Sequence, residues 1–122
     1  MKTKLTVEES QRLIELGVNP KMASNTTITD YDLDMVYYAP RFSVGDLINI
    51  LPKEIEDSNL NIISTQVKNH KKVSGWIVTY VNNYNDLAFG DESVFQSPEL
   101  IDALNKLAIW CLENNHIKTE KK

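Results

Sequence analysis

The residues that could carry covalent or metal chemistry in this 122-residue chain are few and widely spaced. The chain has one cysteine, Cys111, and two histidines, His70 and His116, which lie far apart in the sequence. Zinc sites and cysteine nucleophiles need such groups at short, defined spacings or beside a base. Cys111 falls instead in the apolar stripe of a predicted helix. We therefore expect Cys111 to be a small core residue, and we expect no metal and no cofactor.

Three aspartates, Asp30, Asp32 and Asp34, have the spacing that opens a calcium-binding EF-hand loop. The rest of that motif is missing. Its sixth position should be glycine and is Met35, and its twelfth should be glutamate and is Arg41. The segment is better explained as a solvated acidic loop.

Signatures of larger catalytic sites are also missing. The four glycines are scattered, so the chain has neither a glycine-rich phosphate loop nor a G-x-S-x-G turn. Carboxylates such as Glu54, Glu56 and Asp57 could pair, but the sequence does not set their separation or burial, and acid–base catalysis depends on both. The sequence favours a non-enzymatic protein with no evident small-molecule substrate. A small enzyme is the less favoured alternative.

One local cluster is basic, at Lys68, Lys71 and Lys72, in a predicted hairpin turn. Lysines at such a tip could touch a phosphate backbone, so an accessory nucleic-acid-binding protein is the alternative function. The whole chain carries 17 acidic and 13 basic residues, a net charge of −4, and nucleic-acid binders usually show a basic surplus. We therefore consider nucleic acid the less favoured partner.

Large side chains give the remaining functional signal, because tryptophan and tyrosine are enriched at binding hot spots. On a helical wheel of the last predicted helix, Ile109 falls within the polar face and Trp110 falls at its edge. The residues proposed for a protein interface are Trp110, Ile109, Trp76, Tyr80, Tyr37 and Tyr38. The alternative is that most of them build the core. We expect a protein partner or self-association through at least one of them.

The first half of the chain predicts two short helices. Thr6 and Glu9 form a capping box for a helix over residues 7–16, which Gly17 ends. Residues 18–30 are read as a loop with one helical turn at 20–23. The second half of residues 31–39 has strand composition, and Pro40 is expected to end it. A second helix begins at Ser43 and stops at Pro52.

The second half predicts a sheet and a long helix. Residues 60–67 and 73–81 are rich in β-branched and aromatic side chains and form an antiparallel hairpin. Residues 86–89 could add a third strand. Ser97 and Pro98 start the last helix, which runs to Glu113. The predicted fold is α+β: an antiparallel sheet of three to four strands, packed by a C-terminal helix, with two shorter helices from the N-terminal half.

Length and composition predict one domain over residues 1–122, with a frayed tail at 118–122. Hydrophobic residues make up 42% of the chain, enough for one core. A single cysteine allows no intrachain disulfide, and no apolar run long enough for a signal peptide or membrane span occurs. We expect a cytoplasmic protein that does not enter membranes.

Five segments form a recognisable combination and together cover about half the chain: residues 5–11 (LTVEESQ), 16–18 (LGV), 51–55 (LPKEI), 76–80 (WIVTY) and 100–114 (LIDALNKLAIWCLEN). This combination resembles small prophage and mobile-element proteins of gut Bacteroidetes, a group without an established activity. It implies a bacterial cytosolic setting and a mobile-element origin, and it carries over no catalytic residues. The function expected from the sequence is a non-enzymatic protein-binding module of phage or mobile-element origin.

Overall fold

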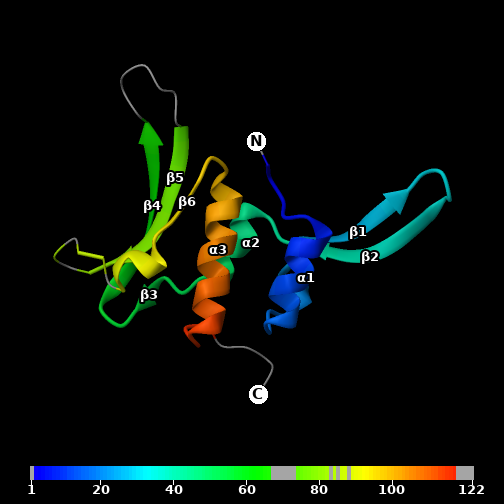
Figure 1. The fold of residues 1–122 in the computed structure, drawn as a ribbon. Coiled ribbons are helices and arrows are strands. Elements are labelled where there is room, and N and C mark those ends of the chain that lie inside the picture. The colour runs from blue at the N-terminus through cyan, green and yellow to red at the C-terminus, as the bar shows by residue number, and fades with distance from the viewer. Residues whose placement is uncertain (1, 67–73, 83, 85, 88, 118–122) are drawn as a thin grey trace.

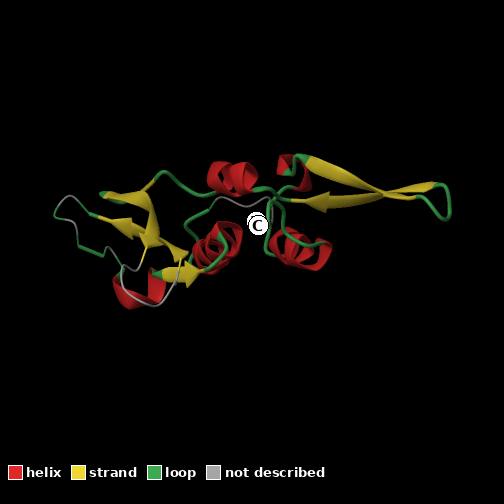
Figure 2. Ribbon diagram, turned by 90° about the horizontal axis from the view of Figure 1, so that it is seen from above, coloured by secondary structure: helices red, strands yellow, loops and turns green. Residues whose placement is uncertain are grey.

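The computed structural model describes residues 2–66, 74–82, 84, 86–87 and 89–117. Figures 1 and 2 show a sheet at one end, helices in the middle and a long hairpin projecting from the other end. The helices are α1 (Val7–Glu15), α2 (Val44–Ile50) and α3 (Leu100–Glu113), with 3-10 turns at Pro20–Met22 and Gly90–Ser93. The strands are β1 (Asn25–Asp30), β2 (Met35–Arg41), β3 (Glu54–Ile55), β4 (Ser58–Gln66), β5 (Ser74–Val81) and β6 (Phe95–Ser97).

Local hydrogen bonds explain where the first two helices begin. The Thr6 hydroxyl accepts from the backbone N–H of Glu9, and the Glu9 carboxylate accepts from the backbone N–H of Thr6. Ser43 and Asp46 form the same reciprocal pair at the start of α2. Each pair satisfies two amides that have no partner within the helix. The predicted starts at Thr6 and Ser43 are confirmed.

Left-handed residues end the longer helices. Gly17 after α1 has φ 114°, and Asn115 after α3 has φ 60°. The residue that follows each of these donates its backbone N–H into the last turn of the helix. Val18 donates to the Leu13 carbonyl, and His116 donates to the Cys111 carbonyl. These are Schellman endings, which the sequence indicated through Gly17 and through the asparagines after Glu113.

The four-stranded sheet has the order β3-β4-β5-β6, with all neighbours antiparallel. The predicted β4–β5 hairpin is confirmed, with Leu60 opposite Tyr80 and Ile62 opposite Val78. The third strand expected at residues 86–89 is wrong, because Leu87 makes only an isolated bridge to Val81. The place beside β5 belongs to β6. The neighbour of β5 is set by the path of the chain through the fold. The amino-acid composition of a segment does not reveal that path.

A second sheet, β1–β2, corrects the prediction that residues 18–30 form a loop with one helical turn. The turn at Pro20–Met22 exists, but residues 25–30 form a strand that pairs with β2. Threonine is polar yet β-branched, so the run at 26–29 suits a strand that is not buried. Pro40 does not end β2 as expected. The register shifts between Asn25 and Thr27, so Pro40 lies at an irregularity where its missing N–H is tolerated.

Helix α3 lies across β5 and β6 and also contacts α2. Its inner stripe is fully buried at Ile101, Leu104, Leu107, Ala108 and Cys111. Burial of one such leucine or isoleucine contributes about 1.5–3 kcal/mol. The helix starts at Leu100 rather than at Pro98, and no side chain caps it, because Ser97 belongs to β6. The predicted α+β fold with a C-terminal helix on the sheet is confirmed.

Candidate functional site

The hairpin of β1 and β2 leaves the body of the molecule and is called the arm below, meaning residues 25–38 (Figures 1 and 2). Its base is firmly attached. The Arg41 side chain donates through Nε to the Leu5 carbonyl at 2.8 Å, and the Leu5 amide donates to the Phe42 carbonyl at 2.9 Å. Leu5 and Phe42 are both fully buried. The arm therefore projects from an anchored base.

Cross-strand register assigns the arm's side chains to two faces. Residues directly opposite one another in an antiparallel pair lie on the same face. One face carries Ile28, Met35 and Tyr37, and the Tyr37 hydroxyl donates to Met35 Sδ at 3.5 Å.

The other face pairs Thr27 with Tyr38 and Thr29 with Val36. Val36 is 65% exposed and Tyr38 is 68% exposed. Soluble proteins usually cover one face of an antiparallel pair, but here both faces present apolar side chains to solvent.

The tip of the arm is a turn at residues 31–34, in which Asp34 has φ 47°. Aspartate tolerates this left-handed conformation better than most residues. Tyr31 is 90% exposed and Leu33 is also exposed. The acidic loop predicted here is thus a hairpin turn carrying exposed apolar groups. Among the described residues, no three histidine, cysteine, aspartate or glutamate side chains gather closely enough to hold a metal ion.

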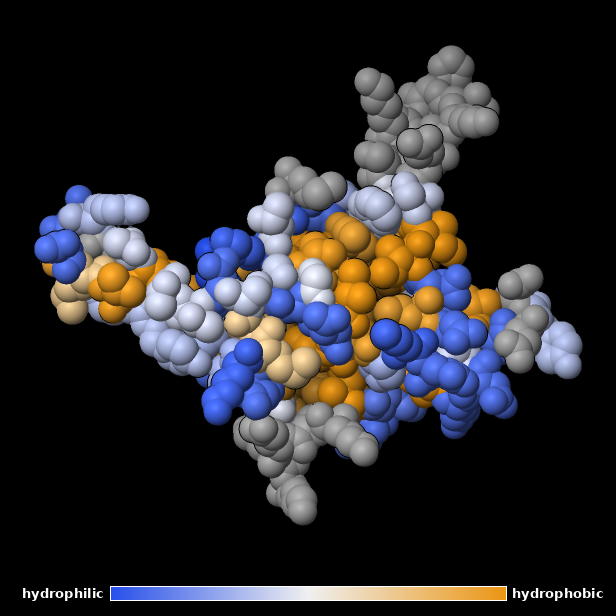
Figure 3. Space-filling model, turned by 180° about the vertical axis from the view of Figure 1, so that it is seen from behind, coloured by the Kyte–Doolittle hydropathy of each residue, from blue (hydrophilic) through white to orange (hydrophobic). Residues whose placement is uncertain are grey.

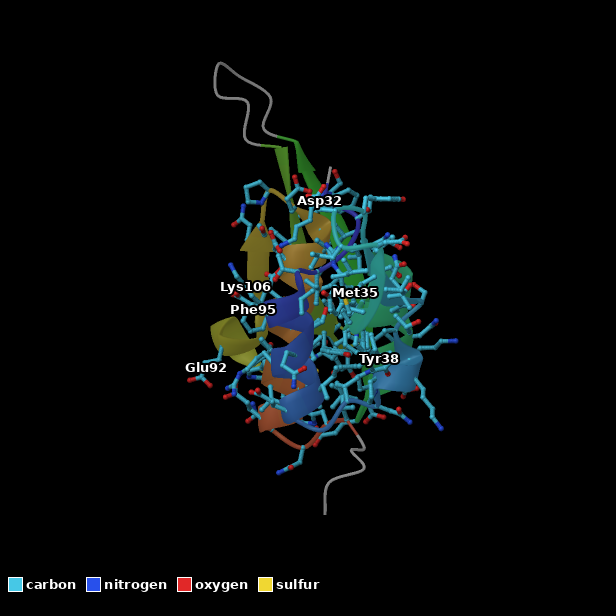
Figure 4. The ribbon with its side chains drawn as sticks, turned by 90° about the vertical axis from the view of Figure 1, so that its right-hand side faces the viewer. Asp32, Met35, Tyr38, Glu92, Phe95 and Lys106 are labelled. Carbon is cyan, nitrogen blue, oxygen red and sulfur yellow. The ribbon has the colours of Figure 1, made fainter. Side chains whose placement is uncertain are left out.

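The arm has a one-sided charge. Residues 25–38 contain Asp30, Asp32 and Asp34 and no lysine, arginine or histidine. Figure 4 shows Asp32 at the end of the arm, with Met35 and Tyr38 along it. Figure 3 shows hydrophobic residues on the arm as well as across the middle of the back face. The arm therefore combines apolar faces with an acidic tip.

The six residues proposed for an interface do not form one surface. Tyr37 and Tyr38 lie exposed on the arm, whereas Tyr80 is fully buried and offers no surface to a partner. Trp76 on β5 and the pair Ile109 and Trp110 on α3 are half-buried. The tyrosines of the arm are thus separated from the α3 residues by the width of the helical layer (Figure 1). The lysines proposed for phosphate contact, Lys68, Lys71 and Lys72, lie outside the described residues.

Ile109 and Trp110 belong to a separate, shallow hollow of about 320 Å³ on the other side of the molecule. Its lining residues are Glu92, Phe95, Lys106, Ile109, Trp110 and Glu113. The Trp110 ring lies against Phe89 at 5.2 Å and against His116 at 5.0 Å, centre to centre. Trp110, at the edge of the helical stripe, therefore packs against two other rings and is half-buried. Figure 4 shows Glu92, Phe95 and Lys106 on the opposite side of the view from Tyr38.

Cys111 and Tyr80, two side chains with ionisable S–H and O–H groups, are both buried. Cys111 is fully buried, and burial raises the pKa of its thiol to about 11. Burial also raises the pKa of the Tyr80 hydroxyl, which donates to the Pro52 carbonyl at 2.7 Å. A protonated thiol enclosed in apolar surroundings is unreactive. The prediction that Cys111 is a core residue is confirmed.

Sequence reasoning missed Ile28, Tyr31, Leu33, Met35 and Val36. Their signal was present, because a β-branched run at residues 26–29 and a strand-like run at 35–38 flank a turn-forming Asp-Leu-Asp. The polarity of the threonines hid the first strand.

Comparison with protein-family models, with curated proteins and with solved structures finds no match to this chain. Within the residues that the structure describes, no helix has the length and apolar character needed to span a membrane.

Proposed function

We propose that this chain is a non-enzymatic protein-binding module and that the arm is its binding element. The observation that supports this most is the exposure of Val36 and Tyr38 on a hairpin whose other face carries Ile28 and Tyr37. A two-stranded hairpin alone in water is marginally stable, and a contiguous exposed apolar surface is typical of an interaction site. A partner that covers the arm would stabilise the hairpin and would remove its apolar side chains from water.

The partner proposed is a different protein with an apolar groove bordered by lysine or arginine. The arm has an acidic tip, with three aspartates and no basic residue anywhere in residues 25–38, so a basic rim would complement it. Two arms brought together would instead repel one another. Among the described residues, neither β1 nor β2 pairs with a third strand, so the partner could also add a strand to the outer edge of either one.

The resemblance to mobile-element proteins favours a host or phage protein as the partner, and this origin remains a prediction. Ile109 and Trp110 are less suited to bind a partner than the arm is, because both are half-buried and Trp110 already contacts two aromatic rings. The large side chains of the arm are more exposed than Ile109 and Trp110, and the arm projects from the body of the molecule.

The experiment has two stages. A photoreactive phenylalanine derivative at position 38 captures what touches the arm in the producing cell, and the captured protein is then purified. Its affinity is measured by calorimetry for the original chain, for the double variant Val36→Thr/Tyr38→Thr, and for the control Ile63→Thr. Ile63 is exposed on β4, so the control replaces one exposed apolar side chain by threonine away from the arm.

We expect the double variant to weaken binding by about 1–3 kcal/mol, the control to have no effect, and binding to weaken with added salt. Equal affinity for the double variant would contradict the proposal. So would a dimer mass in sedimentation for the original chain that falls to a monomer mass in the double variant.

A further inference from the structure

The C-terminal ends of all three α-helices meet at one cavity of about 480 Å³, away from the arm. Its walls come from residues 17–19 after α1, residues 49–52 at the end of α2, and residues 116–117 after α3, with Met22 beside them. Figure 1 shows α1 and α3 running side by side with their ends on the same side of the molecule. The volume lies within the range of small-molecule sites.

Convergent helix ends make this cavity favourable for positive charge. The aligned peptide dipoles of a helix place a partial negative charge at its C-terminus, and the effect is strongest within the last turn. The ten described residues that line the cavity include no lysine, arginine, aspartate or glutamate. His116 is the only titratable side chain among these ten residues, so no permanently charged side chain in the wall offsets the three partial charges.

Helix α2 also ends with carbonyl groups that have no backbone donor in the part of the chain that the structure describes, and the residues that carry them line the cavity. Leu51 is extended, with ψ 136°, and Pro52 has no N–H, so the chain after α2 cannot continue the helical bonds. No backbone donor among the described residues reaches the carbonyls of Asn49 or Ile50, and both residues line the cavity. At α1 and α3, Schellman bonds satisfy the last carbonyls of the helix. Among the described residues, the last carbonyls of α2 have no equivalent bonds.

The apolar part of the wall is formed by Val18, Ile50, Leu51, Pro52 and Ile117. Its polar side chains are those of Asn19, Asn49 and His116. An ammonium group has three N–H donors and no acceptor, so it matches carbonyl groups in a field of negative sign. We propose that this cavity binds a primary ammonium group carried on a short apolar chain, either as a free alkyl amine or as the end of a lysine side chain. This site is independent of the proposed role of the arm.

The test titrates the whole chain with four probes at constant ionic strength and follows the backbone amide NMR signals of Val18, Asn49 and Ile117. The probes are n-butylammonium, n-butanol, n-butyrate and butyltrimethylammonium. We expect saturating shifts with n-butylammonium. The other three probes should bind at least about tenfold more weakly. The quaternary cation has charge but no N–H, so it separates hydrogen bonding from charge alone.

A charge variant tests the location. Asn49 is exposed at the cavity wall, so Asn49→Lys places a tethered ammonium there and should weaken n-butylammonium binding about tenfold. Asn59→Lys makes the same change at an exposed position on β4 and should have no effect. Lysine with its α-amino group acetylated and its carboxyl group amidated distinguishes the sources: affinity at least equal to that of n-butylammonium identifies a lysine side chain, and weaker binding identifies a free amine.

Equal binding of n-butanol or of butyltrimethylammonium would overturn the proposal. An absence of shifts at the three amides would overturn it as well. Unchanged n-butylammonium binding in Asn49→Lys would show that the amine binds elsewhere. The probe series on the unmodified chain decides the matter even if the lysine variant is poorly folded.

Discussion

The Tyr80 hydroxyl donates a hydrogen bond of 2.7 Å to the Pro52 carbonyl, and this bond joins the middle of the sheet to the segment that follows α2. Tyr80 is fully buried, and its ring faces the same side of the sheet as Val78. Tyr80 is thus a core residue with one satisfied polar group. That role explains why a tyrosine proposed for an interface is absent from the surface.

Replacement of Tyr80 by phenylalanine should lower the free energy of unfolding by about 1–3 kcal/mol, because the Pro52 carbonyl loses its donor in a buried setting. Urea denaturation measures the change. Tyr84→Phe is the matched control, since Tyr84 is 85% exposed and its loss of a hydroxyl should change stability by less than about 0.5 kcal/mol. Equal effects of the two substitutions would show that the buried bond contributes nothing.

Cys111 should react with a thiol reagent only when the chain unfolds. Its sulfur is buried, and burial raises the thiol pKa from 9.0 to about 11, although interaction with Tyr80 acts in the opposite direction. We expect labelling in native buffer to be at least about a hundredfold slower than in denaturant. Rapid labelling of the native chain, at the rate of an Asn59→Cys variant, would contradict the burial.

The same shift predicts alkaline sensitivity. A thiol whose pKa is higher in the folded state favours folding while it is protonated. Its contribution is complete below the unfolded pKa of about 9 and is lost as pH rises towards about 11. Urea midpoints measured across this range should fall less steeply for Cys111→Ala than for the original chain. Parallel curves would show that the thiol does not control this loss.

Asp46 should contribute to acid sensitivity. Partial burial opposes its ionisation, but hydrogen bonds from Ser43 and Ser24 outweigh that effect and lower the pKa of its carboxyl. A carboxyl with a lowered pKa stabilises the fold above its unfolded pKa of 3.8, and this contribution is lost as pH falls through the folded pKa.

Between about pH 5 and about pH 3, Asp46→Asn should therefore lose less stability than the original chain. At neutral pH it should already be less stable by about 1 kcal/mol, because a neutral amide caps less strongly. Glu54→Gln, at an exposed position, serves as the control. The expectation fails if all three chains lose stability in parallel as pH falls.

The arm should be dispensable for folding. Tyr38→Thr keeps β propensity and removes an exposed ring, so unfolding free energy should change by less than about 0.5 kcal/mol. Leu104→Ala, in the buried stripe of α3, should cost about 2–5 kcal/mol. Denaturant midpoints of the two variants measure the contrast. A large loss in Tyr38→Thr would show that the arm is a structural element rather than a binding one.

The elements whose signals are local could be predicted from the sequence. Thr6 with Glu9, Ser43 before α2, Gly17 and the asparagines after Glu113 act through hydrogen bonds and backbone angles within a few residues. Strands β4 and β5 are neighbours in the chain, so their composition and the short polar linker between them were sufficient to predict the hairpin. Cys111 could be placed in the core because helical spacing puts it in line with Leu104 and Leu107.

The candidate site could be predicted only in part. Tyr37 and Tyr38 were identified by residue type, but nothing in their own segment separates them from Tyr80, which has the same chemistry in a strand of similar composition. The difference is what lies above each strand. Helix α3 covers β5, whereas α1 contacts β2 but leaves the side chains from Met35 to Tyr38 exposed.

By itself the sequence determined the fold class, the starts of α1 and α2, the ends of α1 and α3, and the central hairpin, since each depends on interactions between residues close in the chain. Tertiary structure alone decided that β6 rather than residues 86–89 borders β5, that the arm stands clear of the body, and that three helix ends share one cavity. Those outcomes depend on which distant surfaces meet. Burial is a property of the assembled elements, and neither periodicity nor composition specifies the partner of an apolar face.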